Sequence, residues 1–484
     1  MRNWSYLTFS NVVQQLLSFI CLVRIARMLA PEGYGSYILI LTAVSIAQVA
    51  AVLGLPQIII RSVSRKNDAL FFIARQALPL LLGGIMAASA GLVGYLFFFT
   101  DVNQPGFLIA GATLVTAQGL WAFAEALAFG RQQMHFSSFL NVASSVCWAI
   151  VIFGLPENLF SIKVVIAVFS FIQILRASVY LLIEWRSGYF KTKETDRNVS
   201  ELTRASLVKQ SLPLFGTNIL SIPVTLLPIL FLGRFSGTTE VGFYGIGNRL
   251  LAPLALVSGS LMTAVYPILA QSFIDDRGVF ITQVQKLFLG LMFVGFLFAL
   301  TVAVFSKEFV LIVFGPHFAP GITPFAIQAW IACNIMMHSF IGNLFLSANK
   351  ERTLVSLSVF NGVVIGVASY YGAHFGALGL SFASWGSLVF GFAVHWFVVR
   401  RKIASDSFRP RYLETALFAF YVLLGIITPL FADFSLALRA VIFVAGIALL
   451  LFLGRSQMGE LRAYIRGRVG KSKEMQFASS TIQR

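Results

Sequence analysis

The sequence predicts an all-α polytopic membrane protein with about fourteen transmembrane helices, arranged as two parallel six-helix lobes plus two extra C-terminal helices. Three observations predict this class: the composition, the spacing of the apolar stretches and an internal repeat. Of the 484 residues, 58% are hydrophobic and only 11% are charged, whereas roughly 25% are charged in a soluble domain. The mean hydropathy of +0.83 also excludes a disordered chain. The apolar residues therefore belong in lipid.

Fourteen apolar stretches are each long enough for one membrane helix, because a bilayer core of about 30 Å needs about 20 residues. They begin near Tyr6, Ser36, Phe71, Phe107, Ser138, Ile162, Ser211, Val241, Leu287, Thr323, Thr353, Ala377, Tyr412 and Ser435. The connections are short and carry the glycines and prolines that break helices, as in the Pro-Glu-Gly sequence at 31–33. The stretches therefore indicate spans joined by tight turns.

Two longer polar segments divide the chain, and they set the expected domain boundaries. We expect an N-terminal six-helix lobe at 1–185, a cytoplasmic linker at 186–209, a C-terminal six-helix lobe at 210–399, helices 13 and 14 at 400–454, and a basic cytoplasmic tail at 455–484. In the tail, the Gly-Lys-Ser sequence at 470–472 lacks the first glycine of a phosphate-binding loop, because position 465 is Ile465. No nucleotide site is expected there.

The basic residues orient the chain. With the N-terminus in the cytoplasm, 28 of the 36 lysines and arginines fall on the cytoplasmic side, as the positive-inside rule requires. Both termini are therefore expected in the cytoplasm. The same distribution explains the net charge of +17 without nucleic acid, because basic loops match the anionic inner leaflet.

A repeat relates the two halves. The pattern Arg-x7-Gly-x-Tyr occurs at 27, 35 and 37 and again at 234, 242 and 244, an offset of 207. A second similarity pairs Gly130, Arg131 and Asn141 with residues 349, 350 and 361, at an offset near 219. Since six helices return the chain to its starting side, the two units are expected to be parallel, as in alternating-access transporters.

Four segments carry a family resemblance over essentially the whole chain. They are RIARMLAPEGYGSY at 24–37, VGFYGIGNR at 241–249, FGPHFA at 314–319 and YGAHFGALG at 371–379. In this order and spacing, with fourteen spans, the chain resembles the polysaccharide and lipid-linked oligosaccharide flippases, such as O-antigen-type flippases, of the multidrug/oligosaccharidyl-lipid/polysaccharide exporter superfamily.

The resemblance implies a function in cell-surface polysaccharide synthesis, for O-antigen lipopolysaccharide, capsule or exopolysaccharide. Such a protein moves an isoprenoid-pyrophosphate-linked oligosaccharide from the cytoplasmic to the periplasmic leaflet of the cell inner membrane, by alternating access without ATP hydrolysis. The implied partners are the lipid-linked oligosaccharide, membrane lipids, and the polysaccharide polymerase and export machinery.

Ionisable side chains inside spans mark candidate sites, because each costs about 2.5 to 3.5 kcal/mol near the bilayer centre. Arg24 and Arg249 come from opposite lobes near equivalent repeat positions, and similar arginines line the cleft in the family. A guanidinium suits a diphosphate by its fixed fork of donors. For Arg24, snorkelling to the outer headgroups is an equal alternative, and for Arg27 snorkelling or a turn contact is favoured.

Two asparagines complete the expected substrate cleft. Asn248 directly precedes Arg249, and Asn218 lies in the seventh stretch, which also holds Pro213, Pro223 and Pro228. Prolines in a membrane helix free backbone carbonyls that need other partners. This stretch is therefore expected to kink, and a bending element is the alternative interpretation.

Glu125 and Arg176 are one acid and one base in spans of the same lobe. A structural ion pair is the favoured interpretation, since pairing relieves the desolvation of both groups. The alternative is that Glu125 takes up a cation or proton and couples transport to a gradient. The three cysteines lie singly in apolar runs and no metal-ligand cluster occurs, so we expect neither a metal nor a cofactor.

Two other functions compete with the flippase. A cation-coupled drug or metabolite exporter of the same fold is the first, but its cationic cargo would need acids in the spans, which offer Glu125 against three or four arginines. The second is a membrane glycan polymerase or ligase, which would need a catalytic outer loop. No outer loop reaches twenty residues, and therefore the chain is not expected to be an enzyme.

Overall fold

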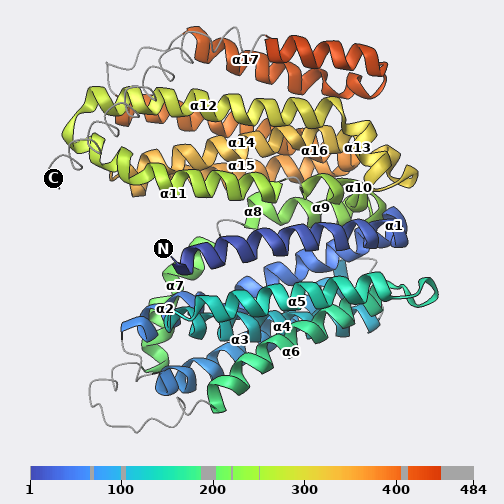
Figure 1. Ribbon diagram of the computed structural model, residues 1–484, viewed down its shortest axis with the longest axis vertical. Coiled ribbons are helices and arrows are strands. Elements are labelled where there is room, and N and C mark those ends of the chain that lie inside the picture. Colours follow the sequence, from blue (N-terminus) through green and yellow to red (C-terminus); the bar gives the residue numbers. More distant parts are fainter. Residues whose placement is uncertain are drawn as a thin grey trace, which may run out of the picture. The chain divides into compact units, whose positions relative to one another are not determined.

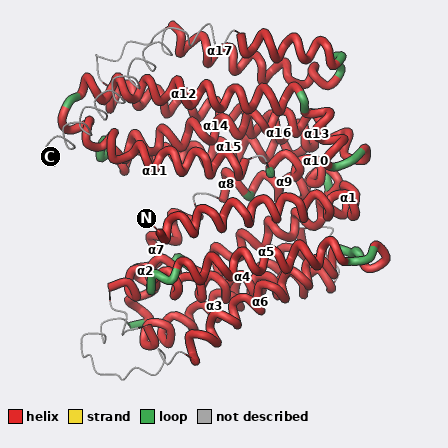
Figure 2. Tube along the Cα trace, in the orientation of Figure 1, coloured by secondary structure: helices red, strands yellow, loops and turns green. Residues whose placement is uncertain are grey.

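A computed structural model of the chain describes residues 2–65, 70–99, 105–186, 203–219, 222–249, 251–404 and 412–448. Within these ranges the chain forms helices joined by short turns and contains no strand (Figure 2). Most of the expected linker, the end of helix 14 and the basic tail lie outside the described residues. The all-α class is confirmed.

The helices follow one another along the chain with few intervening residues (Figure 1). In the first half they are α1 (Arg2–Val52), α2 (Leu55–Arg65), α3 (Leu70–Phe99), α4 (Pro105–Gly130), α5 (Met134–Gly154), η2 (Glu157–Leu159), α6 (Ile162–Arg186), α7 (Arg204–Ile219), α8 (Ile222–Thr225), α9 (Leu227–Phe235) and α10 (Thr238–Asn248).

In the second half they are α11 (Leu251–Asp275), α12 (Arg277–Val304), α13 (Ser306–Val313), η5 (Pro316–Gly321), α14 (Ile322–Ser347), α15 (Glu351–Gly372), η6 (Ala373–Phe375), α16 (Gly376–Val399), η7 (Arg400–Ala404), α17 (Tyr412–Ile427) and η9 (Thr428–Ala432).

The membrane spans can be counted from these helices. Nine segments of the described chain are long and apolar enough to cross a bilayer, and two of them, Phe9–Val52 and Glu351–Ile403, each contain two helices joined at a residue with positive φ. The shorter apolar helices Leu417–Phe431 and Leu436–Ala448 and the broken α7–α9 segment supply the rest. Together they account for the fourteen predicted spans.

The repeat is visible in the backbone of one pair of turns. Ala30 adopts φ 55° and ψ 177°, and Gly237 adopts φ 87° and ψ 174°. These residues are 207 positions apart, the offset predicted from the Arg-x7-Gly-x-Tyr pattern. Each turn separates two apolar helices, and therefore the two copies of the pattern have the same local structure.

The second similarity requires a correction of two residues. Backbone amides of 131, 132 and 133 donate to the carbonyls of 127, 129 and 128, and those of 348, 349 and 350 donate to 344, 346 and 345 in the same pattern. Gln132 and Asn349 both have positive φ, which gives an offset of 217 instead of about 219. The alignment of Asn141 with Asn361 was therefore wrong, because it matched residue types and not the position of the turn.

The chain folds into two compact units. The first comprises Met1–Pro253, Lys307–Gln328 and Val355–Gly391, and the second comprises Leu254–Ser306, Ala329–Leu354 and Phe392–Arg484. In the first unit α1 packs against α3, α4, α5 and α10, and α4 packs against α6. All the predicted site residues belong to this unit. The lobes at 1–185 and 210–399 stay a prediction.

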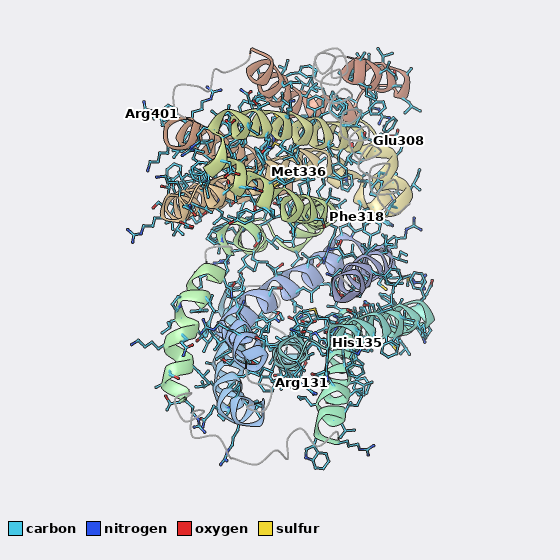
Figure 3. The ribbon with its side chains drawn as sticks, turned by 60° about the vertical axis from the view of Figure 1, so that its left-hand side comes forward. Arg131, His135, Glu308, Phe318, Met336 and Arg401 are labelled. Carbon is cyan, nitrogen blue, oxygen red and sulfur yellow. The ribbon has the colours of Figure 1, made fainter. Side chains whose placement is uncertain are left out.

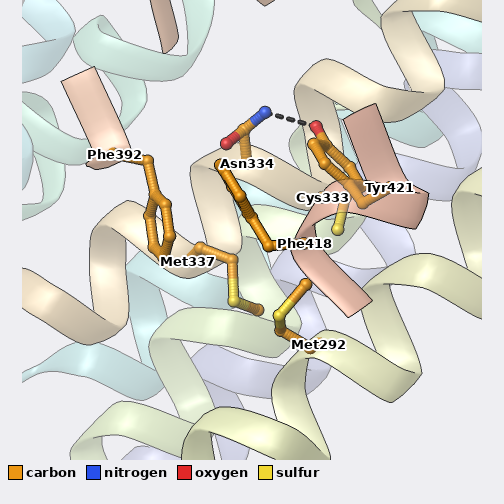
Figure 4. A pocket seen from close by; sticks show the side chains of 7 residues that line it. All are labelled: Met292, Cys333, Asn334, Met337, Phe392, Phe418 and Tyr421. Atoms are coloured by element: carbon orange, nitrogen blue, oxygen red, sulfur yellow. Dashed lines mark hydrogen bonds between the residues drawn. The ribbon is translucent and has the colours of Figure 1, made fainter. Parts of the chain in front are cut away.

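In the second unit a buried polar chain ties α17 to α14. Trp330 donates to the Thr428 hydroxyl (2.8 Å), the Tyr421 hydroxyl donates to the Trp330 carbonyl (2.9 Å), and Asn334 donates to Tyr421. Figure 4 shows this last bond at the edge of a cavity lined by aromatic and sulfur-containing side chains. The cavity holds only about 10 Å³, the lower limit for one water molecule. This region is therefore packed core.

Candidate functional site

The two copies of the repeat meet where α1 crosses α10. A Cβ atom added at Gly35 would lie 1.7 Å from the carbonyl oxygen of Thr238, and one added at Gly242 would lie 2.1 Å from that of Pro31. Adding 207 converts Pro31 to Thr238 and Gly35 to Gly242, so that each contact is the repeat image of the other. Because no side chain fits between the backbones, only glycine allows this approach.

Aromatic side chains surround this crossing. The Tyr34 ring is fully buried and lies 5.9 Å from the ring of Phe318, on η5, which in turn lies 6.4 Å from the ring of Phe243 on α10. Figure 3 labels Phe318, and it also labels Arg131 and His135 near the turn between α4 and α5. The crossing is therefore a packed contact surrounded by buried aromatic rings.

Arg249 lies at the C-terminal end of α10, directly after the crossing. Its side chain is exposed, and its guanidinium lies close enough to Tyr34 and Tyr37 of α1 to act on them electrostatically. Asn248, which precedes it, is half-buried. The exposed charge is thus held beside buried tyrosines at the contact between the two repeat copies.

Arg24 lies on α1, two turns before the turn at Ala30. Its side chain is half-buried, and its guanidinium carbon lies 5.8 Å from the centre of the Phe153 ring on α5. The Nε atom is buried and has no hydrogen-bond partner. An unpaired donor on a charged group inside a span is costly, so this atom has bonding capacity for a ligand. The contacts of Arg24 and of Arg249 are with different neighbours, Phe153 for the first and Tyr34 and Tyr37 for the second.

Arg27 makes the turn contact that the sequence favoured over a ligand role. Its Nε donates to the Val313 carbonyl (2.8 Å), and a terminal nitrogen donates to the Ile312 carbonyl. These are the last residues of α13, where carbonyls lack helical partners and the helix dipole is negative. Arg27 therefore joins α1 to the end of α13.

Asn218 lies near the end of the described part of α7. The chain is helical over Ile222–Thr225 and again from Leu227, and Pro228 follows the interruption at Leu226 by two positions. This agrees with the loss of helical hydrogen bonds at proline. The Asn218 side chain is half-buried, and its helix contacts α1 and α3.

Glu125 and Arg176 belong to one buried polar network, and Asn141 joins them. Asn141 on α5 donates to the Glu125 carboxylate on α4 (3.2 Å) and accepts from Arg176 on α6 (2.7 Å). Ser137 also donates to Glu125 (3.2 Å), and the Arg176 guanidinium stacks 3.8 Å from the centre of the Trp121 ring. Sequence reasoning named the two charges but missed the amide, although Asn141 stood in a repeat motif.

Residues 1–273 match the model of a family described as polysaccharide biosynthesis protein. The chain belongs to this family. No curated protein sequence matches the chain.

Two solved structures share the fold of this chain. The lipid II flippase MurJ in an inward closed conformation is 11% identical, with a TM-score of 0.68 over 93% of this chain and 99% of that one. A multidrug resistance MATE family transporter of the MOP superfamily, in an inward-facing conformation, is 13% identical, with a TM-score of 0.60 over 80% of this chain and 94% of that one. The chain thus has the MurJ/MATE-like transporter fold, and it is a multi-pass membrane protein of the polysaccharide biosynthesis family.

Proposed function

We propose that the protein is a flippase that moves an isoprenoid-pyrophosphate-linked oligosaccharide from the cytoplasmic to the periplasmic leaflet of a cell inner membrane, for surface polysaccharide synthesis. Both termini lie in the cytoplasm, and the polysaccharide polymerase and export machinery receive the product. The observation that carries the proposal is the match to the polysaccharide biosynthesis family over residues 1–273, together with arginines in the spans.

The charges of the first unit favour an anionic cargo. Arg24 keeps a buried donor without a partner, and Arg249 presents an exposed guanidinium at the end of α10. The half-buried acid Glu125 already accepts hydrogen bonds from Ser137 and Asn141. We assign the diphosphate to the two arginines and the sugar hydroxyls to Asn248 and Asn218, because hydroxyls left unpaired in hydrocarbon are costly.

The mechanism is alternating access without ATP hydrolysis. The α1–α10 crossing is the contact that closes the outer side, and transport requires the two repeat copies to separate there. The closest contact, at Gly35 and Gly242, is made between backbones, and the interruption between α8 and α9 supplies a place to bend. The Glu125–Asn141–Arg176 network holds α4, α5 and α6 together as a structural unit.

A variant series at Arg249 tests the substrate site. In proteoliposomes that contain a fluorescent isoprenoid-pyrophosphate-linked glycan, Arg249→Ala should lower the translocation rate by roughly a hundredfold, since two charge-assisted hydrogen bonds are lost. Arg249→Lys should recover only part of the rate, because the fork geometry is absent. The exposed Lys350 in the α14–α15 turn is the control, and Lys350→Ala should translocate normally. Normal translocation by Arg249→Ala would refute the assignment.

The second candidate is a cation-coupled drug or metabolite exporter, which the MATE-like fold supports. The two functions differ in the sign of the cargo. An organic cation accumulated against its gradient by the same proteoliposomes, with no movement of the lipid-linked glycan, would favour the exporter. We expect glycan movement only.

A further inference from the structure

The first unit contains an apolar groove that none of the predicted site residues lines. It has a volume of about 500 Å³ and is formed by α1, α3 and one residue of α9. Its lining residues are Ala43, Ile46, Ala47, Ala50, Leu53, Gly84, Ala87, Ala88, Gly91, Leu92, Tyr95 and Leu230. The volume falls within the roughly 300 to 1,000 Å³ of ligand sites.

The groove is wide because most of the side chains that line it are small. On each long helix the lining residues recur at intervals of three and four, so that they share one face. Most are alanine or glycine, and nothing lies within 4 Å of a Cβ atom added at Gly91. At Gly84 the helices touch, because an added Cβ there would lie 2.3 Å from the Ala51 carbonyl oxygen. The groove is thus closed near Gly84 and wide beyond it.

The other end of the groove is polar and positive. Tyr95 is the one lining residue with a polar side chain, and Arg234 acts electrostatically on it. Arg234 follows the lining residue Leu230 by four positions on α9, so that both lie on the same face of the helix. The Arg234 side chain is exposed. Arg234 therefore lies one helical turn from a residue that lines the groove, near enough to Tyr95 to act on it electrostatically.

We propose that this groove binds the isoprenoid chain of an isoprenoid diphosphate, with the diphosphate at Arg234. An apolar channel with a cation at one end matches a chain with an anionic head. Small wall residues favour a methyl-branched isoprenoid over a straight acyl chain, because each branch needs lateral room. The inference rests on the proposed function and extends it. It assigns the isoprenoid chain of the lipid carrier to the groove between α1 and α3, at the stage of transport when the diphosphate has left Arg24 and Arg249.

Photolabelling of the full-length protein in phosphatidylcholine nanodiscs tests the groove. The probe is farnesyl diphosphate that carries a diazirine in its isoprenoid chain, and peptide mass spectrometry locates the adducts. We expect adducts within 43–53 and 84–95. Gly91→Leu, which fills the groove, should reduce them by roughly tenfold. Gly83→Leu is the matched control, because it lies on the same helix, also has open space around its Cβ and does not line the groove. Its labelling should equal that of the unaltered protein.

Variants of Arg234 distinguish a diphosphate site from an ordinary lipid groove. Arg234→Ala should lower the labelling by roughly tenfold, with partial recovery in Arg234→Lys, and unlabelled farnesyl diphosphate should compete while phosphatidylglycerol should not. Equal competition by phosphatidylglycerol would overturn the inference.

The rise in unfolding temperature when the same probe binds is a second measurement. It distinguishes a failure of the groove assignment from a failure of the proposed function. Stabilisation that is lost in Arg249→Ala, with adducts outside the groove, overturns the groove and leaves the flippase standing. Neither stabilisation nor adducts would overturn both.

Discussion

The two copies of the Arg-x7-Gly-x-Tyr pattern share their backbone but differ in what their first residues do. In both, a turn residue with positive φ and ψ near 180° precedes a helix, and a glycine five positions later contacts the other copy. Arg27 is engaged by two carbonyls of α13, whereas its counterpart Arg234 is exposed beside Tyr95. The crossing is therefore common architecture, and the arginine is structural in one copy and available to a ligand in the other.

The turn residue itself also differs, and this difference has an energetic consequence. Ala30 occupies a region of backbone conformation that is essentially restricted to glycine, and the second copy has Gly237 there. Such strain costs about 1 to 3 kcal/mol. In the first copy Arg27, three residues before this turn, joins α1 to α13.

The largest expected effect is at the crossing. Gly35→Ala and Gly242→Ala should each lower the free energy of unfolding by about 3 kcal/mol, the upper end of the range for overpacking, because the new Cβ atoms would overlap backbone oxygens. Gly83→Ala, with nothing within 4 Å, is the control and should change it little. Thermal unfolding in detergent ranks the three variants by their loss of stability. Two tolerated alanines at the crossing would show that the repeat copies do not meet there.

Substitutions at the turn should act in opposite directions. Gly237→Ala should destabilise the protein by about 1 to 2 kcal/mol, because it introduces the strain that Ala30 already carries. Ala30→Gly should stabilise it by about 1 kcal/mol, the relieved strain less the entropy lost by glycine. The same unfolding measurement, applied to the two variants and to the double exchange, checks the signs. A loss of stability in Ala30→Gly would contradict the equivalence of the two turns.

The smallest expected stability effects separate the two arginines. Arg27→Ala should cost about 1 kcal/mol, since its hydrogen bonds are made at an exposed position. Arg234→Ala should leave the unfolding temperature nearly unchanged and reduce only isoprenoid diphosphate binding. Paired unfolding and binding measurements on both variants decide this. If Arg234→Ala proved the more destabilising of the two, the assignment of roles would be reversed.

The helices were predictable because membrane spans depend on local apolar length, and the Arg-x7-Gly-x-Tyr offset was predictable because both copies keep the same spacing through the turn. The second offset was wrong by two residues, since residue types around Gly130 and Asn349 are a weaker guide than the hydrogen bonds of the turn. The ionisable residues inside spans could be identified from the sequence because each one raises the free energy of the chain in lipid.

What the sequence did not disclose depends on tertiary packing. Asn141 joins Glu125 to Arg176 only because three helices bring their faces together. The groove exists because the small residues of α3 face those of α1, and glycine and alanine in a membrane helix more often mark close packing than open space. Gly35 and Gly91 are both glycines in apolar helices, yet one is enclosed by backbone and the other is open.

Cross-linking the crossing tests the central claim most directly. Ser36 and Thr238 flank the contact at Gly35, and Ser36→Cys with Thr238→Cys, in a background that lacks Cys21, Cys147 and Cys333, places one thiol on each repeat copy. Each single-cysteine variant under the same oxidation is the control. We expect oxidation of the double variant to lower glycan translocation by at least roughly tenfold and a reductant to restore it, because transport requires the crossing to open. Undiminished translocation by protein shown to be cross-linked would contradict alternating access at this contact.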